Sequence, residues 1–198
     1  MHGNIEDKSV EKAIDGDADA FNEVSLRLRD TVYNFACRML GSTPAAEDIT
    51  QETFMFLIER PEKYQPERGS SLSVFLCGVA RNKIMHHLRR SGRHSEISTD
   101  TDDDYIEPKD ENGQDPLEIL LDRELALKVE ESVAALPPSQ REAIILRDLQ
   151  EFSYEEIAEI CGGNINTVKS RVHRARLSLA RRMERYKAAG RKNCHEMY

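Results

Sequence analysis

The sequence has no long apolar run, and this absence argues against a membrane-spanning protein. A transmembrane helix needs roughly 18 or more consecutive apolar residues, and no stretch of the chain approaches that length. The first residues, MHGNIEDKSVEK, also lack the apolar core of a secretory signal. We therefore expect a protein that stays in the cytoplasm and does not insert into a membrane.

Cysteine is scarce, and its spacing is irregular. Cys37, Cys77, Cys161 and Cys194 show no C-x-x-C arrangement, so neither a disulfide framework nor a zinc site of that kind is expected. Cys194 adjoins His195 in the C-terminal tail, but two adjacent ligands without a second pair make a poor metal site.

Sequence signatures of catalysis are also missing. The chain contains no nucleophile elbow, no phosphate-binding loop and no carboxylate pair. We therefore expect a protein without catalytic residues, cofactor, metal or small-molecule substrate.

What the chain does contain is helical periodicity, with no strand candidate to compete with it. Apolar residues recur at spacings of three and four over 21–39, a second helical segment spans 45–60, and a third runs from about Leu72 to Arg90. Together these segments predict a first domain at 8–93.

Apolar content then falls sharply. The stretch TDTDDDYIEPKDENGQDP cannot bury enough apolar surface to offset the entropy lost on ordering it. We predict a flexible acidic linker at 94–116, a second helical domain at 117–186 and a tail at 187–198. The predicted fold class is all-α, with two small helical domains joined by this linker.

The net charge of −8 is unevenly distributed. Residues 96–131 hold fourteen acidic and three basic residues, whereas 164–192 hold ten Lys and Arg and one acid. A basic element beside an acidic segment is typical of nucleic-acid binders, although two solvated surfaces of opposite sign would look the same.

Two Ser-x-x-Glu patterns in the last third predict capping boxes at helix starts. They are Ser139 with Glu142, after two prolines, and Ser153 with Glu156. The helix that follows Ser153 stops at Gly162-Gly163, and a basic helix begins near Asn166. A helix, a short glycine turn and a basic helix predict a helix-turn-helix.

The basic helix has an apolar stripe, formed by Val168, Val172, Ala175 and Leu179, and a polar outer face. Such a helix fits the major groove of B-DNA. Arg174, Lys169 and Ser170 suit base edges by side-chain type, whereas Arg171, Arg181 and Arg182 suit phosphates. The competing interpretation is a basic solvated helix with no role in DNA binding.

Two long segments resemble one family. Residues 136–179, LPPSQREAIILRDLQEFSYEEIAEICGGNINTVKSRVHRARLSL, closely resemble region four of extracytoplasmic-function (ECF) sigma factors. Residues 17–90, from DADAF to HHLRR, resemble region two of the same family, in the family's order. The resemblance implies a non-catalytic subunit that binds core RNA polymerase, recognises the −10 and −35 elements of promoter DNA, and is controlled by an anti-sigma factor.

The resemblance also implies roles for individual residues. AEDITQETF at 46–54 matches the segment that docks on the clamp helices of the largest polymerase subunit, and residues 64–90 match the part that opens and reads the −10 element. In the second segment, the loop QPERGSS can hold an extruded base. The expected contacts are Asp48, Gln51 and Glu52 for polymerase; Arg81, Asn82, Lys83, Arg89 and Arg90 for the −10 element; and Thr167, Lys169, Ser170, Arg171, His173 and Arg174 for the −35 element.

The acidic linker has an implied role as well. In the family it threads toward the RNA exit path of the polymerase, and Asp102, Asp103 and Asp104 would then imitate nucleic-acid charge. A plain solubilising tether fits the same composition.

The chain departs from the family pattern at two places. Leu72 and Phe75 stand in the usual Phe-x-x-Trp-Leu run, and the chain has no tryptophan. We expect Phe75 to fill a core site there. The helix-turn-helix turn reads Gly163-Asn164-Ile165-Asn166, in which asparagine can still cap a helix.

Two other functions fit parts of this pattern. A conventional helix-turn-helix transcriptional regulator leaves the region-two resemblance unexplained. A sigma mimic that sequesters an anti-sigma factor would be expected to lose its DNA-reading bases, yet Lys169, Arg171, Arg174 and Arg176 are all present.

Overall fold

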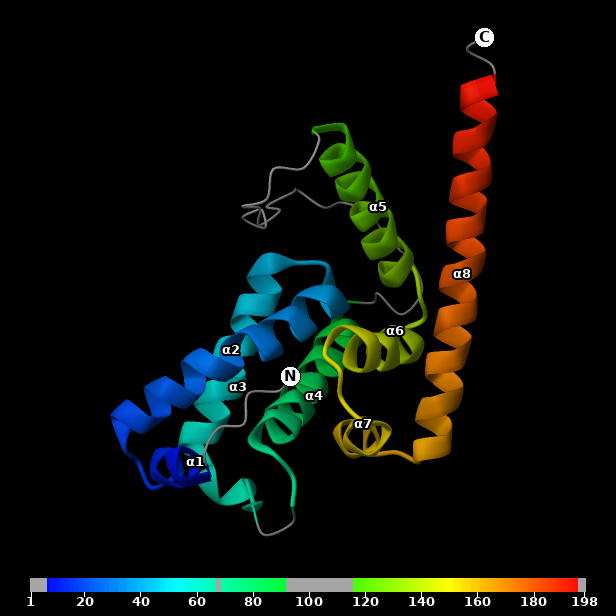
Figure 1. Cartoon of the computed structure of the whole chain (residues 1–198). Coiled ribbons are helices and arrows are strands. Elements are labelled where there is room, and N and C mark those ends of the chain that lie inside the picture. The colour runs from blue at the N-terminus through cyan, green and yellow to red at the C-terminus, as the bar shows by residue number, and fades with distance from the viewer. Residues whose placement is uncertain (1–6, 67–68, 92–115, 196–198) are drawn as a thin grey trace.

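The structure is a computed structural model, and it describes residues 7–66, 69–91 and 116–195. The regular structure of these residues is entirely helical (Figure 1), which confirms the predicted all-α fold. In chain order the elements are α1 (Asp7–Ile14), α2 (Ala18–Leu40), α3 (Thr43–Glu59), the 3-10 turn η1 (Pro61–Lys63), α4 (Leu72–Arg90), α5 (Pro116–Ala134), α6 (Pro138–Ile144), the π-helical turn η3 (Ile145–Leu149), α7 (Tyr154–Cys161) and α8 (Ile165–His195). Apart from Pro116, the predicted linker at 94–116 lies outside the described residues.

The first bundle is built around α2, whose inner face is completely buried. Val24, Phe35 and Met39 lie on this face, and α3 and α4 pack against it. The Asp17 carboxylate caps α2 by accepting hydrogen bonds from two backbone amides at 3.0 Å, and Gly41 ends the helix in the left-handed conformation at φ 62°.

The short helix α1 also packs on α2, through Val10 and Ala13. The apolar periodicity of the sequence does not predict α1 as a separate helix.

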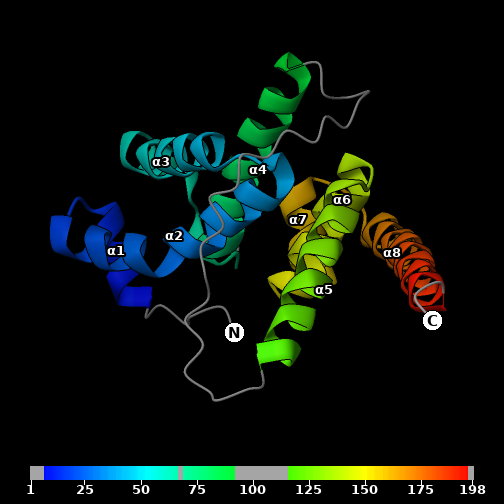
Figure 2. The ribbon, with the colours of Figure 1, turned by 90° about the horizontal axis from the view of Figure 1, so that it is seen from above.

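The second bundle contains α6, η3, α7 and α8 around fully buried Ile145, Leu146, Phe152 and Ile157. The predicted stripe of α8 lies against this core, with Val168, Val172 and Ala175 buried and Leu179 half-buried. Helix α5 packs on α8, and α8 continues past the bundle to His195 (Figures 1 and 2). The helix therefore extends through most of the predicted tail at 187–198.

One of the two predicted capping boxes is wrong. Ser153 and Glu156 form the expected box at the start of α7. Helix α6, however, begins at Pro138, so Ser139 lies inside the helix, and no side chain caps it. Glu142 turns away from the helix start, is 1% exposed, and pairs with Arg81 of α4.

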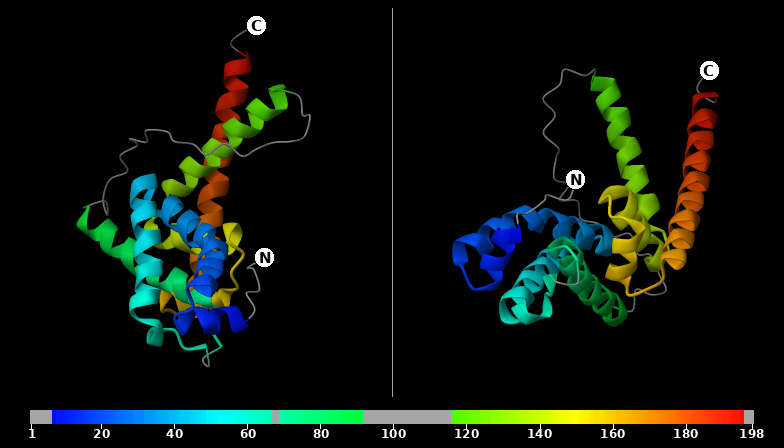
Figure 3. Two further views of the ribbon diagram at one scale, coloured as in Figure 1. Left: turned by 90° about the vertical axis from the view of Figure 1, so that its left-hand side faces the viewer. Right: turned by 60° about the horizontal axis from the view of Figure 1, so that its bottom comes forward.

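The two bundles pack directly against each other. Helix α4 of the first contacts α7 of the second, and α2 contacts α5, α6 and η3. Figure 3 (right) shows α6 and α7 between the first bundle and α8. Two side chains of the second bundle donate hydrogen bonds to α2 carbonyls, Arg141 Nη1 to Met39 at 2.8 Å and Gln150 Nε2 to Thr31 at 2.6 Å.

Candidate functional site

The outer face of α3 carries the side chains predicted to contact polymerase. Asp48, Gln51 and Glu52 are all exposed, because Ile49, Thr53, Phe54 and Leu57 occupy the opposite, buried face. Glu52 also forms an ion pair with Lys83 of α4 at 2.8 Å. The three residues thus lie on one accessible surface, as their spacing predicts.

This surface continues into two apolar residues that the sequence analysis missed. Met55 is 47% exposed and Ile58 is 59% exposed. Met55 follows Gln51 by four residues, and Ile58 follows Met55 by three. The three residues therefore lie on the same side of the helix. The apolar run FMFLI could have revealed them. Five consecutive residues of a helix cannot all face the core, so some of the run must be exposed.

Helix α4 does not gather the predicted −10 contacts on one face. Arg81 points toward α6 and contacts Glu142, Lys83 points toward α3 and contacts Glu52, and Asn82 is exposed between them. Arg89 and Arg90 are exposed in the last turn, where Arg89 Nε donates to the Met85 carbonyl at 3.1 Å. Asn82 therefore lies between two ion-paired cations, Arg81 on the side of α6 and Lys83 on the side of α3.

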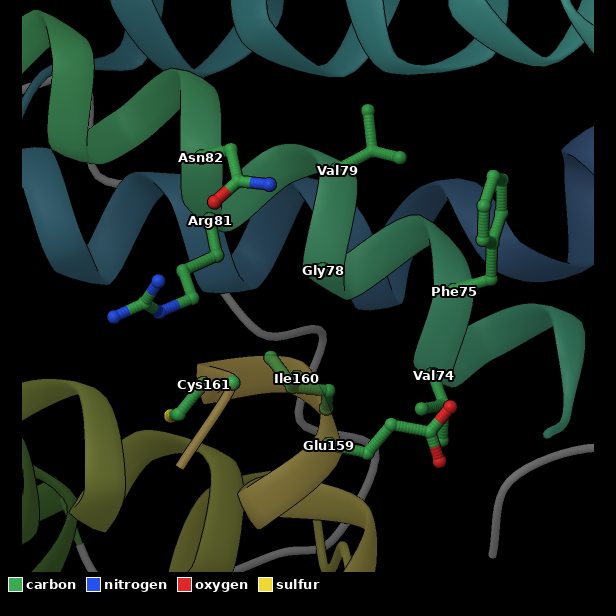
Figure 4. A pocket seen from close by; sticks show the side chains of 10 residues that line it. Val74, Phe75, Gly78, Val79, Arg81, Asn82, Glu159, Ile160 and Cys161 are labelled. Atoms are coloured by element: carbon green, nitrogen blue, oxygen red, sulfur yellow. The ribbon is translucent and has the colours of Figure 1, made fainter. Parts of the chain in front are cut away.

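A cleft of about 310 Å³ separates α4 from α7 (Figure 4). Asn82 and Phe75 line it from α4, and Ile160 and Cys161 line it from α7. Phe75 does not enter the core as expected. It is half-buried, with its ring 5.4 Å from that of Tyr64 and 6.5 Å from that of Phe56.

Arg81 and Glu142 form the most buried ion pair among the described residues. The Glu142 carboxylate is 1% exposed, and Arg81 Nε donates to it. Burial lowers the pKa of Arg81, but the charge and hydrogen bond of Glu142 outweigh it, so the net shift is upward. Next to this pair, burial and the Glu142 charge raise the pKa of the Cys161 thiol to about 12.

The helix-turn-helix is built by local capping. Gly162 ends α7 in the left-handed conformation at φ 62°, and the Gly163 amide donates to the Ala158 carbonyl at 2.8 Å. Asn164 then caps α8, because its Oδ1 accepts a hydrogen bond from the Asn166 amide at 2.8 Å. The unusual turn sequence therefore still joins the two helices tightly.

The outer face of α8 presents the predicted −35 contacts. Its members are the exposed Thr167, Lys169, Ser170, His173 and Arg174 and the half-buried Arg171. The Ser170 hydroxyl donates to the Thr167 carbonyl at 2.8 Å. Lys169 Nζ lies 5.6 Å from the centroid of the Tyr154 ring, which orients this lysine at the edge of the surface.

The arginines further along α8 have different surroundings. Arg176 forms two hydrogen bonds with Asp148 at 2.9 and 2.6 Å, and these, with the Asp148 charge, raise the pKa of Arg176. Arg182 is half-buried and donates to the Ala135 carbonyl at 3.3 Å, whereas Arg181 is exposed. Of the two arginines at 181 and 182, Arg181 is the better placed for a phosphate.

The described part of the chain contains no group of three or more His, Cys, Asp or Glu residues that could hold a metal. Within the same residues, no helix is both long and apolar enough to cross a bilayer.

Comparison with known proteins identifies the class of these two bundles. Residues 26–94 match the model of sigma-70 region 2, and residues 126–179 match that of sigma-70 region 4. The chain is 37% identical to the ECF RNA polymerase sigma factor EcfG of Rhodopseudomonas palustris, over 74% of this chain and 75% of EcfG. It is 33% identical to the ECF sigma factor SigE of Mycolicibacterium smegmatis, over 81% of this chain. The chain belongs to the ECF family of RNA polymerase sigma factors.

Two further findings set the extent of this similarity. The match to SigE covers 60% of the length of that relative. Among solved structures, the sigma factor RpoE of Bartonella quintana, in complex with the anti-sigma factor NepR, aligns with a TM-score of 0.65 and 29% identity over 83% of this chain and 96% of RpoE.

Proposed function

We propose that this protein is a dissociable specificity subunit of RNA polymerase, which binds the core enzyme and directs it to promoters with particular −10 and −35 elements. The observation that carries the proposal is the presence in one chain of a region 2 bundle and a region 4 helix-turn-helix, in the family's order. The subunit itself has no catalytic step, and it works in the cytoplasm with the polymerase.

The outer face of α3 is the proposed docking surface for the clamp helices of the largest polymerase subunit. Its first half offers exposed Asp48, Gln51 and Glu52 for polar contacts. Its second half offers Met55 and Ile58, whose burial on docking would add a hydrophobic contribution. A mixed apolar and polar patch of this kind is typical of protein interfaces.

DNA recognition is proposed for α4 and α8. Asn82 has the donor and acceptor pair that suits a base edge, and Arg89 and Arg90 supply charge for the backbone. On α8, Arg174, Lys169 and Ser170 would enter the major groove at the −35 element.

An anti-sigma factor is the third proposed partner. RpoE of Bartonella quintana, which shares the fold of this chain, was solved in complex with one. The same class of partner would regulate this chain by covering its polymerase-binding or DNA-binding surfaces.

Run-off transcription with purified core polymerase tests the proposal. We expect transcripts with defined start sites on a pool of promoter fragments only when this protein is added. Absence of both stimulation and binding to core would contradict the proposal and favour the sigma mimic or the conventional regulator.

A further inference from the structure

Helices α3 and α4 pack against each other (Figure 2), and an ion pair joins them at the surface. It is formed by Lys83 Nζ of α4 and Glu52 Oε2 of α3, at 2.8 Å. The Glu52 side chain is 59% exposed, whereas that of Lys83 is 28% exposed. The carboxylate is therefore the more accessible partner of the pair, and the ammonium is the more covered one.

The two partners belong to different proposed surfaces. Glu52 is one of the side chains proposed to dock on polymerase, together with exposed Asp48 and Gln51. Lys83 is one of the proposed −10 contacts and follows Asn82, which is exposed on α4. The ion pair thus connects the polymerase-docking face of α3 directly to the DNA-reading helix.

The spacing along α4 indicates where the Lys83 ammonium would act once it is released. Arg90 follows Lys83 by seven residues, so both lie on the same side of the helix. Arg90 is exposed and is proposed to contact the DNA backbone. Because lysine has a long and flexible stem, its ammonium can turn from Glu52 to a phosphate without movement of the backbone. Lys83 would then bind the same DNA strand as Arg90.

We propose that Glu52 is shared by the two surfaces and couples polymerase docking to −10 recognition. This inference rests on the proposed function and deepens it. In the free chain, Glu52 holds Lys83 and keeps its ammonium from the DNA strand. On docking, hydrogen-bond donors of the clamp helices take the Glu52 carboxylate, and Lys83 becomes available for a phosphate. Lys83 therefore contributes to strand binding in the complex with core and contributes little in the free chain.

The exposure of the pair sets the size of this coupling. Surface ion pairs are weak, so Glu52 exchanges its partner readily, and the effect on binding is about two- to fivefold. Coupling between two binding sites is reciprocal. Core therefore strengthens strand binding by the same factor by which the strand strengthens core binding, and the factor can be measured from either side.

The first measurement is the affinity of the full chain for purified core polymerase, with and without a single-stranded oligonucleotide that carries the −10 element found by run-off transcription. The ratio of the two affinities is the coupling factor. For K83Q we expect this factor to fall about two- to fivefold, because Lys83 contacts the strand only in the complex. The matched variant is R90Q. Because Arg90 is exposed in the free chain, R90Q should weaken strand binding with and without core and leave the coupling factor unchanged.

The second measurement is the binding of the same oligonucleotide, labelled with a fluorophore, to the free chain. E52Q releases Lys83, and we expect strand binding to tighten about two- to fivefold. Loss of any acidic side chain also favours DNA binding in general, and E59Q controls for this effect. Glu59 is exposed on the same side of α3, about 10 Å further along the helix axis. E59Q should therefore produce a smaller gain than E52Q.

The combined variant E52Q/K83Q separates the released lysine from the general effect of charge. If the gain of E52Q comes from Lys83, strand binding by the combined variant should tighten no more than E59Q does. All of these exchanges are at exposed or half-buried positions, so the circular dichroism and melting of each variant should match the wild type.

A coupling factor that is the same in K83Q and the wild type would overturn the shared role of Glu52. Equal gains from E52Q and E59Q, or a gain of E52Q that persists in the K83Q background, would overturn it too. A wild-type protein that supports run-off transcription while the variants give these results would refute only the coupling. A wild-type protein that never stimulates core polymerase would remove the proposed function, and this inference with it.

Discussion

Arg174 and Arg181 lie on the same helix, but their positions predict different roles in DNA binding. Arg174 is exposed in the N-terminal half of α8, close to Ser170 and the helix-turn-helix turn. Arg181 is exposed seven residues later, about 10 Å further along the helix axis. Residues near the start of a recognition helix reach base edges, whereas those further away meet the backbone.

We expect R174A to lose roughly 1–3 kcal/mol of binding and to relax sequence preference at one −35 position. R181A should weaken all promoters about equally and flatten the salt dependence by about one phosphate contact. The measurement is holoenzyme binding to a set of −35 point variants at several salt concentrations. A uniform loss from both exchanges would contradict base reading by Arg174.

Glu142 shows why some residues could not be assigned from the sequence. Its pattern with Ser139 is the same as that of Glu156 with Ser153, and only the latter forms a capping box. The difference is a partner 61 positions away in the chain, Arg81. A local pattern contains no information about such a contact.

The two Ser-x-x-Glu patterns allow a matched experiment on helix capping. S153A removes the hydroxyl that accepts a hydrogen bond from the Glu156 amide at 3.1 Å. We expect this exchange to lower the free energy of unfolding by about 1 kcal/mol. S139A replaces a serine inside α6, where no side chain caps the helix, and should cost much less. Urea unfolding followed by circular dichroism measures both. Equal losses would show that the cap of α7 contributes no more than an ordinary helical serine.

At the scale of the helices, α3 shows what a helical pattern can and cannot predict. The spacing of Asp48, Gln51 and Glu52 predicts one exposed face, and the structure has it. The exposure of Met55 and Ile58 cannot be predicted from residue type alone, because Met and Ile are among the residues most often buried. Similarly, α4 was predicted over its observed range, whereas the eight-residue α1 has too few apolar positions to stand out.

We expect M55E and I58E each to weaken binding to core polymerase at least tenfold, because docking would bury a charge opposite the clamp helices. Both positions are exposed, so the free energy of unfolding should change by no more than about 0.5 kcal/mol. L26E is the matched control, since Leu26 is 67% exposed on α2 of the same bundle. Competition binding to fluorescent core measures the effect, and similar losses in all three variants would argue against a specific docking face.

At the scale of the whole molecule, the placement of the two bundles could not be predicted from the sequence. Gln150 bonds to Thr31 across 119 positions and Arg141 to Met39 across 102, and these residues carry no recognisable motif. The predicted linker at 94–116, which joins the bundles, has no packing pattern to set their orientation. The relative placement of the two bundles therefore emerges only from the three-dimensional structure.

Two thiols report on this arrangement independently of DNA. Cys77 is fully buried in the first bundle and Cys161 is half-buried beside α4, and burial is the first cause that raises each pKa to about 12. The thiolate is the reactive form, so raising the pKa well above pH 8 makes both thiols slow to react at that pH. Separation of α7 from α4 would hydrate Cys161 and lower its pKa toward its usual value, whereas Cys77 would stay buried until the first bundle unfolds.

Two exchanges weaken contacts between the bundles: Q150A removes the hydrogen bond from Gln150 to the Thr31 carbonyl, and E159Q weakens the one that Glu159 accepts from Ser70. We expect Cys161 to be alkylated at pH 8 several-fold faster in E159Q and Q150A than in the wild type, with Cys77 equally slow in all three. Both exchanges leave Glu142 in place, so the carboxylate that raises the pKa of Cys161 is unchanged. Separation removes the burial, which is the largest cause, together with the weaker and opposing charge of Arg81. Peptide mass spectrometry distinguishes the sites. Faster labelling of both cysteines would indicate general unfolding, and equal labelling of Cys161 in all three proteins would contradict separation of α7 from α4.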